Sequence, residues 1–279
     1  MGARSESKAL EAINEIKQKD PDAEIEFLNL DLSSLVSVVA AARDLQSKTT
    51  MLHGLINNAG IMGVPFALTA DGFESQFQTN YLSHWLLTHL LLPLLISTSN
   101  VTHPGDVRIV NVTSGGHNTF APDGGIVFDD IQLQSKGPMV RYGQSKLGNV
   151  LHAKELHRRF GPKDGDPKAG EIWVTAVHPG NIYTNLTKQA TGSIPRPVLQ
   201  ILAPLGRCLG ILDEQAKGGL SSLFAIASTD FKRSDSGAYI VPYAKIGTPS
   251  AYAQDPALAL KLWDWTVLEL EKKGVLGDK

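Results

Sequence analysis

The chain of 279 residues has little that could crosslink it or give it a strong charge. It contains one cysteine, Cys208, so no disulfide can form within the chain. The 26 Lys and Arg residues nearly balance the 28 Asp and Glu residues, giving a formal net charge of −2. This balance, without a basic stripe, argues against binding to nucleic acid. The first residues lack the apolar run of a signal peptide, so we expect a cytoplasmic globular protein.

Long apolar runs and metal-ligand patterns are also scarce. The most apolar stretch, from Leu86 to Ile96, is interrupted by His89 and Pro93. It is too short to span a bilayer and predicts a buried helix. Histidine pairs such as His84 and His89 are five positions apart, whereas two zinc ligands on one helical face are four apart. We therefore predict neither a transmembrane segment nor a metal site.

Helical and strand patterns alternate along the chain, without repeats or low-complexity segments. Strands such as 107–112 are apolar on both faces, as is typical of parallel strands covered by helices. The alternation predicts an α/β fold: one domain over residues 1–279 with a doubly wound, mostly parallel sheet flanked by helices. The expected strands are 25–30, 52–57, 107–112, 172–177 and 238–241. The expected helices are 5–19, one capped by Ser33 or Ser34, 71–95, 140–160, 213–228 and 256–272.

Small and polar motifs lie where ligands bind on such a sheet, beyond the carboxyl ends of its strands. These motifs are Asn57-Asn58-Ala59-Gly60, Thr113-Ser114-Gly115-Gly116, Tyr142-Gly-Gln-Ser-Lys146 at a helix start, and His178-Pro179-Gly180. Tyr142 and Lys146 share one helical face because they are four positions apart. Each motif alone is consistent with a turn, a helix cap or a surface pair. Their order along the alternating pattern favours a catalytic site.

Together these motifs resemble the short-chain dehydrogenase/reductase family, over essentially the whole chain. Asn-Asn-Ala-Gly-Ile-Met, the long interval between Ser114 and Tyr142, and His-Pro-Gly-x-x-x-Thr-Asn resemble its retinol-dehydrogenase-like branch. The resemblance implies a catalytic set of Asn80, Ser114, Tyr142 and Lys146. It also implies cofactor contacts at Arg4, Asp31, Leu32, Asn58, Ala59, Gly60, Tyr142, Lys146, Pro179, Gly180, Ile182 and Thr184.

The resemblance implies hydride transfer between a nicotinamide cofactor and an alcohol or carbonyl substrate. Tyr142 would donate the proton to the forming alkoxide, with its pKa of about 10 lowered by the nearby Lys146 ammonium. Ser114 would hold the substrate oxygen, and Asn80 would break its helix locally to position a water for proton relay. Arg4 lies where family members bind the 2′-phosphate of NADP, so we expect NADP rather than NAD. The segment 185–217 is expected to be a lid over an apolar substrate, with a packing helix or a membrane-surface segment as the alternatives.

One family motif is missing from the chain. The family holds the cofactor pyrophosphate with a glycine-rich turn after its first strand, yet no two of the 26 glycines have the spacing Gly-x-Gly. Gly2 to Ser5 resembles the end of the family's second strand. We therefore expect the chain to lack about one βαβ unit, comprising the first strand, the first helix and most of the second strand. This would leave a gap between strands 25–30 and 52–57.

Two functions follow from this combination of retained and missing motifs. Without the glycine-rich turn, two or three charge-assisted hydrogen bonds to the cofactor pyrophosphate are lost. This makes the free energy of cofactor binding less favourable by about 3 to 9 kcal/mol. We therefore expect one of two cases. The sequence is either an incomplete gene model or fragment of an NADP-dependent alcohol dehydrogenase or carbonyl reductase, with the missing motif encoded upstream, or a truncated, non-catalytic member that binds a partner. Retention of all four catalytic residues favours the enzyme. The sequence predicts no oligomeric state.

Overall fold

The computed structural model describes residues 1–165, 170–180 and 217–277, and its strands form two sheets. Strand β1 (Gly2–Ala3) pairs in parallel with β2 (Leu28–Asn29). The larger sheet has the order β3-β4-β5-β6-β7, and only the pair β6–β7 is antiparallel. Its strands are β3 (Gly54–Asn57), β4 (Arg108–Val112), β5 (Trp173–Val177), β6 (Tyr239–Val241) and β7 (Lys245–Gly247). The predicted α/β fold with a mostly parallel sheet is confirmed.

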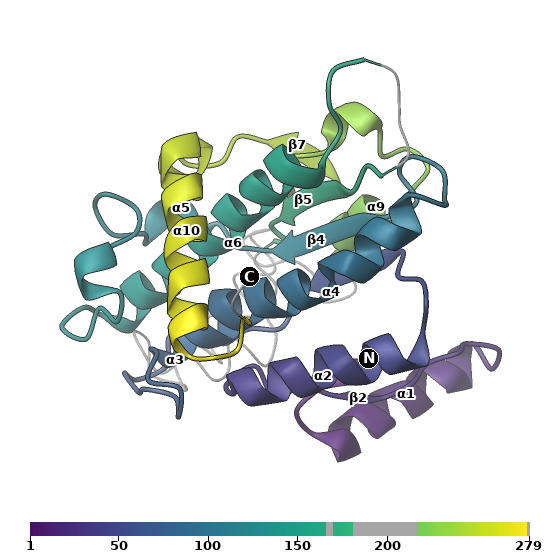
Figure 1. Ribbon diagram of the computed structural model, residues 1–279, viewed down its shortest axis with the longest axis horizontal. Helices are drawn as coiled ribbons and strands as arrows, with labels where there is room; N and C mark the ends of the chain where they lie inside the picture. The colour runs from purple at the N-terminus through teal and green to yellow at the C-terminus, as the bar shows by residue number, and fades with distance from the viewer. Residues whose placement is uncertain (166–169, 181–216, 278–279) are drawn as a thin grey trace, which may run out of the picture.

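Helices flank both faces of the larger sheet (Figure 1). Helix α6 packs on β4 and β5 and is covered by α10, while α9 contacts β3 to β6 from the other face. Helix α2 packs against α4 and joins the amino-terminal part to the main body. The long helices are α1 (Glu6–Lys19), α2 (Leu35–Lys48), α4 (Ser83–Ser99), α6 (Pro138–Phe160), α9 (Leu220–Ala227) and α10 (Pro256–Lys272). Short ones are α3 (Ser75–Phe77), α5 (Gly116–Thr119), a π-helix (Gln78–Leu82) and 3-10 turns at Phe128–Asp130, Arg233–Asp235 and Tyr252–Gln254.

Strand β4 shows how the sheet divides the core. Alternate side chains of a strand point to opposite faces. Ile109 therefore belongs to the main apolar core with α4, α6 and α10, whereas Val110 and Val112 pack with Ala225 of α9. All three side chains are fully or almost fully buried. The strand is apolar on both faces because helices cover both of them.

Helix starts agree with the sequence where a capping serine is present. Ser5 accepts a hydrogen bond from the backbone N–H of Lys8 at the start of α1, and Ser34 accepts one from Ser37 at the start of α2. The helix predicted from residue 71 begins instead at Ser75. The Asp71 carboxylate accepts a hydrogen bond from the backbone of Leu35 at 2.9 Å, and Gly72 takes a φ of +83°. Both features keep this turn out of the helix.

The apolar stretch around residues 86–96 is buried, as predicted. The helical run from Ser75 to Ser99 continues through Pro93 and ends four residues beyond the predicted end at residue 95. By length and composition it could cross a membrane, with a mean hydropathy of 1.2 in its most apolar window. However, 67% of that window is buried inside the protein, as in the core helix of an α/β domain.

The prediction missed one strand, and two predicted segments fall partly outside the described residues. Strand β7 was not predicted, because a three-residue hairpin strand has too short a pattern to detect. Within the described residues the helix predicted at 213–228 begins at Leu220, and nearly all of the expected lid at 185–217 lies outside them. No described strand is hydrogen-bonded between β1 and β3. The missing βαβ unit stays a prediction.

Helix α6 packs unusually closely against the segment that follows β4, and a glycine permits this contact. A Cβ atom added at Gly143 would lie 2.4 Å from the carbonyl carbon of Phe120 and 2.5 Å from the backbone nitrogen of Ala121. These are backbone atoms, which cannot swing aside as a flexible side chain can. Gly143 therefore fixes the distance between α6 and this segment.

We expect Gly143→Ala to lower the free energy of unfolding by about 1 to 3 kcal/mol, because overpacking must move the helix or the facing backbone. Gly137→Ala, just before the same helix, is the matched control, since a Cβ there meets nothing within 4 Å. Urea denaturation measures both. Equal stability of the two variants would contradict the close packing.

Candidate active site

The predicted site motifs meet at one edge of the larger sheet. Strands β3, β4 and β5 are parallel neighbours, so their carboxyl ends lie side by side. Asn58, Ala59 and Gly60 follow β3, with Asn58 and Ala59 exposed. Ser114 follows β4, and Pro179 and Gly180 follow β5. The structure therefore brings together three segments that are far apart in the sequence.

Tyr142 lies against the segment that carries Ser114. Its side chain is only 3% exposed, and a Cβ atom at Gly116 would lie 2.9 Å from the tyrosine ring. A hydrogen bond with the Ser114 side chain lowers the tyrosine pKa, but burial has the larger effect and raises it. The expected lowering of this pKa is therefore not observed. A buried phenol favours its neutral form, which is the form that can donate a proton.

Lys146 lies one turn further along α6. Its Nζ donates to the carbonyl oxygen of Val112 at 3.1 Å and lies 5.9 Å from the centre of the Tyr142 ring. The Thr113 hydroxyl donates to the Lys146 carbonyl at 2.7 Å, which ties α6 to the end of β4. Burial lowers the pKa of Lys146 to about 8. Its nearest partner is a backbone carbonyl rather than the phenol, which explains why it does not lower the Tyr142 pKa here.

Asn80 lies in the π-helical segment Gln78–Leu82, so the helix is locally distorted at the residue where a break was expected. Its side-chain amide bonds to both the N–H and the carbonyl of Ile61, at 2.8 and 2.9 Å, and to the Ser145 hydroxyl at 2.9 Å. The backbone carbonyl of Asn80 accepts a hydrogen bond from His84 Nδ1 at 3.0 Å. Asn80 thus links the segment after β3 with α6.

The amino-terminal cofactor candidates lie at the ends of β1 and β2. Arg4 directly follows β1 and Asp31 follows β2 closely, and these two strands are parallel neighbours. The Asp31 carboxylate accepts hydrogen bonds from the backbone and hydroxyl of Ser33 at 2.9 and 2.6 Å. Leu32 is buried in the main core. The remaining candidates, Ile182 and Thr184, lie outside the described residues.

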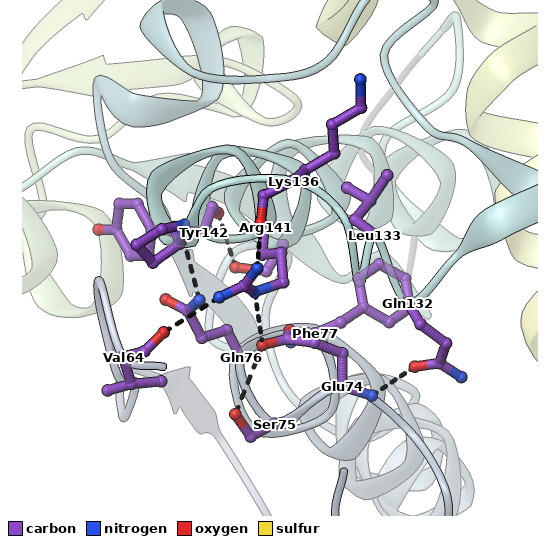
Figure 2. A network of polar contacts seen from close by, with 12 residues as sticks. Val64, Glu74, Ser75, Gln76, Phe77, Gln132, Leu133, Lys136, Arg141 and Tyr142 are labelled. Carbon is purple, nitrogen blue, oxygen red and sulfur yellow. Dashed lines mark hydrogen bonds and ion pairs between the residues drawn. The ribbon is translucent and has the colours of Figure 1, made fainter. Parts of the chain in front are cut away.

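Several polar residues beside the site were not predicted from the sequence. His117 Nδ1 donates to the Ser114 carbonyl at 2.6 Å, and its Nε2 accepts from the Ser250 N–H at 3.2 Å. Glu74, Gln76 and Arg141 form a buried polar network around the start of α6 (Figure 2). Their signal in the sequence is weak, because single polar residues do not reveal contacts with distant segments. The position of Arg141 next to Tyr142 is the one local sign.

Two buried histidines lie behind the site. His84 and His152 are 4% and 3% exposed. His152 Nδ1 accepts a hydrogen bond from the Asn111 amide at 3.1 Å. Burial lowers the pKa of His84 to about 4 and that of His152 to about 3. Both rings are therefore neutral in the folded protein at neutral pH.

These histidines predict a loss of stability in acid. Below about pH 6.5 the unfolded chain binds protons that the folded chain does not, so the free energy of unfolding falls as the pH decreases towards 4. We expect roughly 3 kcal/mol per histidine over this range. His152→Gln should flatten the pH dependence in urea denaturation compared with the unaltered chain. Equal pH dependence in the variant and the unaltered chain would contradict the assignment.

Comparison with known proteins identifies the family of the chain. The family model described as "short chain dehydrogenase" matches residues 1–123. Over 278 residues the chain is 50% identical to the short-chain dehydrogenase/reductase drtF of Aspergillus calidoustus, covering 99% of this chain and 86% of that protein.

Two solved structures show the same fold at 19% identity. One is 3-oxoacyl-[acyl-carrier protein] reductase from Brucella melitensis in complex with NAD, with a TM-score of 0.61 over 93% of this chain and 86% of that one. The other is NADPH-bound carbonyl reductase from chicken fatty liver, with a TM-score of 0.56 over 89% and 86%. The chain therefore belongs to the short-chain dehydrogenase/reductase family of oxidoreductases.

Proposed function

We propose that this protein transfers a hydride between NADP(H) and an apolar alcohol or carbonyl compound, with Tyr142 as the general acid and base. The observation that carries the proposal is the convergence of Ser114, Tyr142, Lys146 and Asn80 beyond the carboxyl ends of β3 and β4. Three chain segments supply these side chains: the π-helical segment with Asn80, the end of β4 with Ser114, and α6 with Tyr142 and Lys146. A purely structural role does not require this combination of phenol, ammonium, hydroxyl and amide at one sheet edge.

The residues divide the reaction between them. Ser114 would hold the substrate oxygen beside the Tyr142 hydroxyl, since these two side chains are hydrogen-bonded to each other. Burial keeps the phenol protonated and ready to protonate a forming alkoxide. Lys146, whose pKa is lowered to about 8, keeps a substantial protonated fraction near neutral pH. Its ammonium would stabilise the phenolate left behind after proton donation.

The site fits the reactive end of a nicotinamide cofactor. A Cβ atom at Gly60 would lie 3.0 Å from Asn80 Oδ1 and 3.4 Å from Lys146 Nζ. A glycine at this position therefore keeps the space between the backbone and these two side chains open. Asn58, Ala59, Gly60 and Lys146 would hold the ribose and nicotinamide, with Pro179 and Gly180 on the β5 side. When bound, the cofactor supplies or accepts the hydride. Arg4 and Asp31 would lie towards the adenosine end.

The alternative function is non-catalytic binding of a partner by a member of the same family. The missing Gly-x-Gly spacing is the observation in its favour, because such a turn supplies much of the pyrophosphate binding. Calorimetry with NADPH separates the two. The enzyme predicts binding that is weak, with a dissociation constant up to the millimolar range, but measurable. A folded chain that releases no heat with NADPH would favour the alternative.

Tyr142→Phe tests the assigned proton donor. We expect it to abolish NADPH-dependent reduction of carbonyl compounds while leaving the affinity for NADPH nearly unchanged, because only the hydroxyl is removed. Turnover is followed by NADPH absorbance and affinity by calorimetry. Tyr243→Phe is the control, since this ring lies 48% exposed in the turn between β6 and β7. Turnover that survives in Tyr142→Phe would refute the assignment.

Arg4→Ala tests the cofactor preference. Loss of one charge-assisted contact to a 2′-phosphate should weaken NADPH binding about tenfold to a hundredfold and leave NADH binding unchanged. Competition between the two cofactors measures the ratio. Arg43→Ala on the exposed face of α2 should alter neither affinity. An unchanged ratio in Arg4→Ala would exclude Arg4 from the cofactor site.

A further inference from the structure

A buried ion pair lies next to the site, and neither of its residues takes part in the chemical steps of the proposed reaction. Glu74 and Arg141 are 1% and 4% exposed, and Arg141 Nε lies 3.4 Å from Glu74 Oε1. Arg141 directly precedes Tyr142 in α6. A buried charge is unfavourable unless another group compensates it, so a pair in this position is worth explaining.

The Glu74 side of the pair begins the helical segment that leads to Asn80. Its carboxylate caps α3 by accepting a hydrogen bond from the backbone N–H of Phe77 at 2.8 Å. The backbone N–H of Glu74 donates to Gln132 Oε1 at 2.5 Å. Burial raises the pKa of Glu74, and the charge of Arg141 opposes this rise. Glu74 is thus held in place by groups from two other parts of the chain.

The Arg141 side reaches two further segments (Figure 2). One guanidinium nitrogen donates to the Val64 carbonyl at 3.3 Å, and another donates to the Lys136 carbonyl. The guanidinium carbon lies 5.5 Å from the centre of the Phe66 ring. Arg141 therefore connects the start of α6 with the loop that follows Asn58–Gly60.

Gln76 makes a parallel connection between the same segments. Its Oε1 accepts from the Gly63 N–H at 2.8 Å, and its Nε2 donates to the Pro138 carbonyl at 3.0 Å. The loop after β3, the segment before Asn80 and the start of α6 thus share one buried network. Each of these three segments carries a residue that the proposed reaction uses.

We propose that Arg141 is a positioning residue: paired with Glu74, it holds Tyr142 at a set position relative to Asn80 and the Asn58–Gly60 backbone. This inference rests on the proposed function. Lysine cannot reproduce the role fully, because the planar guanidinium contacts Glu74, Val64 and Lys136 in different directions at once. A displacement of about 1 Å at a reacting group can lower the rate by about a hundredfold.

Glu74→Gln, Arg141→Met and the double variant separate positioning from simple stability. Each single change leaves one uncompensated buried charge and should lower the melting temperature. The double variant has no buried charge and should melt above both single variants. We nevertheless expect its kcat to be about tenfold to a hundredfold below that of the unaltered chain, with a smaller change in KM for the carbonyl substrate. Arg141→Lys keeps the charge, and its kcat should lie between that of Arg141→Met and that of the unaltered chain.

The ion pair of Glu171 and Arg233 provides a matched control. Its Nη2–Oε1 distance is 2.6 Å, and Glu171 is 8% exposed. The double change Glu171→Gln/Arg233→Met should leave kcat unchanged. Normal kcat in the Glu74→Gln/Arg141→Met variant would overturn the proposal. An equal loss of kcat in both double variants would overturn it as well.

A spectroscopic readout tests the positioning role separately from the proposed function. If the unaltered chain reduces no carbonyl compound, the proposed function is refuted, but the position of Tyr142 can still be measured. In protein labelled with ¹³C-tyrosine, Tyr142→Phe identifies the Tyr142 ring signal. We expect this signal to shift in the Glu74→Gln/Arg141→Met variant and to stay in place in the Glu171→Gln/Arg233→Met variant. An unshifted Tyr142 signal in the first variant would overturn the proposal.

Discussion

Helix α6 is enclosed by the sheet, α5 and α10, and it still carries a row of polar side chains. Nearly every residue from Arg141 to Leu156 is buried, including Lys146, Asn149 and His152. Buried polar groups are costly unless they are hydrogen-bonded. Several of their partners lie at the carboxyl end of β4: Lys146 and Asn149 both donate to the Val112 carbonyl, at 3.1 and 3.0 Å. The packing of the fold and the geometry of the site therefore depend on the same contacts.

This arrangement explains why the site lies at the sheet edge. Ser114 and Gly116, after the end of β4, lie against the start of α6. Asn80 connects α6 with Ile61, which follows β3. Arg141 connects α6 with the loop around residue 64. None of these contacts could form if the strands ended at different levels. Parallel pairing of β3, β4 and β5 sets these levels. The hydroxyl, phenol and ammonium are then held by a rigid scaffold rather than by loops alone.

The sequence predicted most of the architecture because its signals are local. Apolar strands, a capping serine at Ser33 or Ser34, and the four-residue spacing of Tyr142 and Lys146 can all be recognised within short windows. Contacts between distant segments could not be predicted in this way. Glu74 and Arg141 are 67 positions apart, and nothing in either local pattern indicates the other. The raised Tyr142 pKa was missed for a similar reason, since burial depends on the packing of Gly116 and α5 around the ring.

We propose that the side chains gathered at this sheet edge form a working oxidoreductase site. The most direct test is to incubate the purified chain and NADPH with a panel of apolar aldehydes and ketones, measuring both cofactor oxidation and alcohol formation. We expect at least one compound to be reduced, with one alcohol formed for each NADPH oxidised. A folded chain that binds NADPH yet reduces none of them, and oxidises none of the corresponding alcohols with NADP, would contradict it.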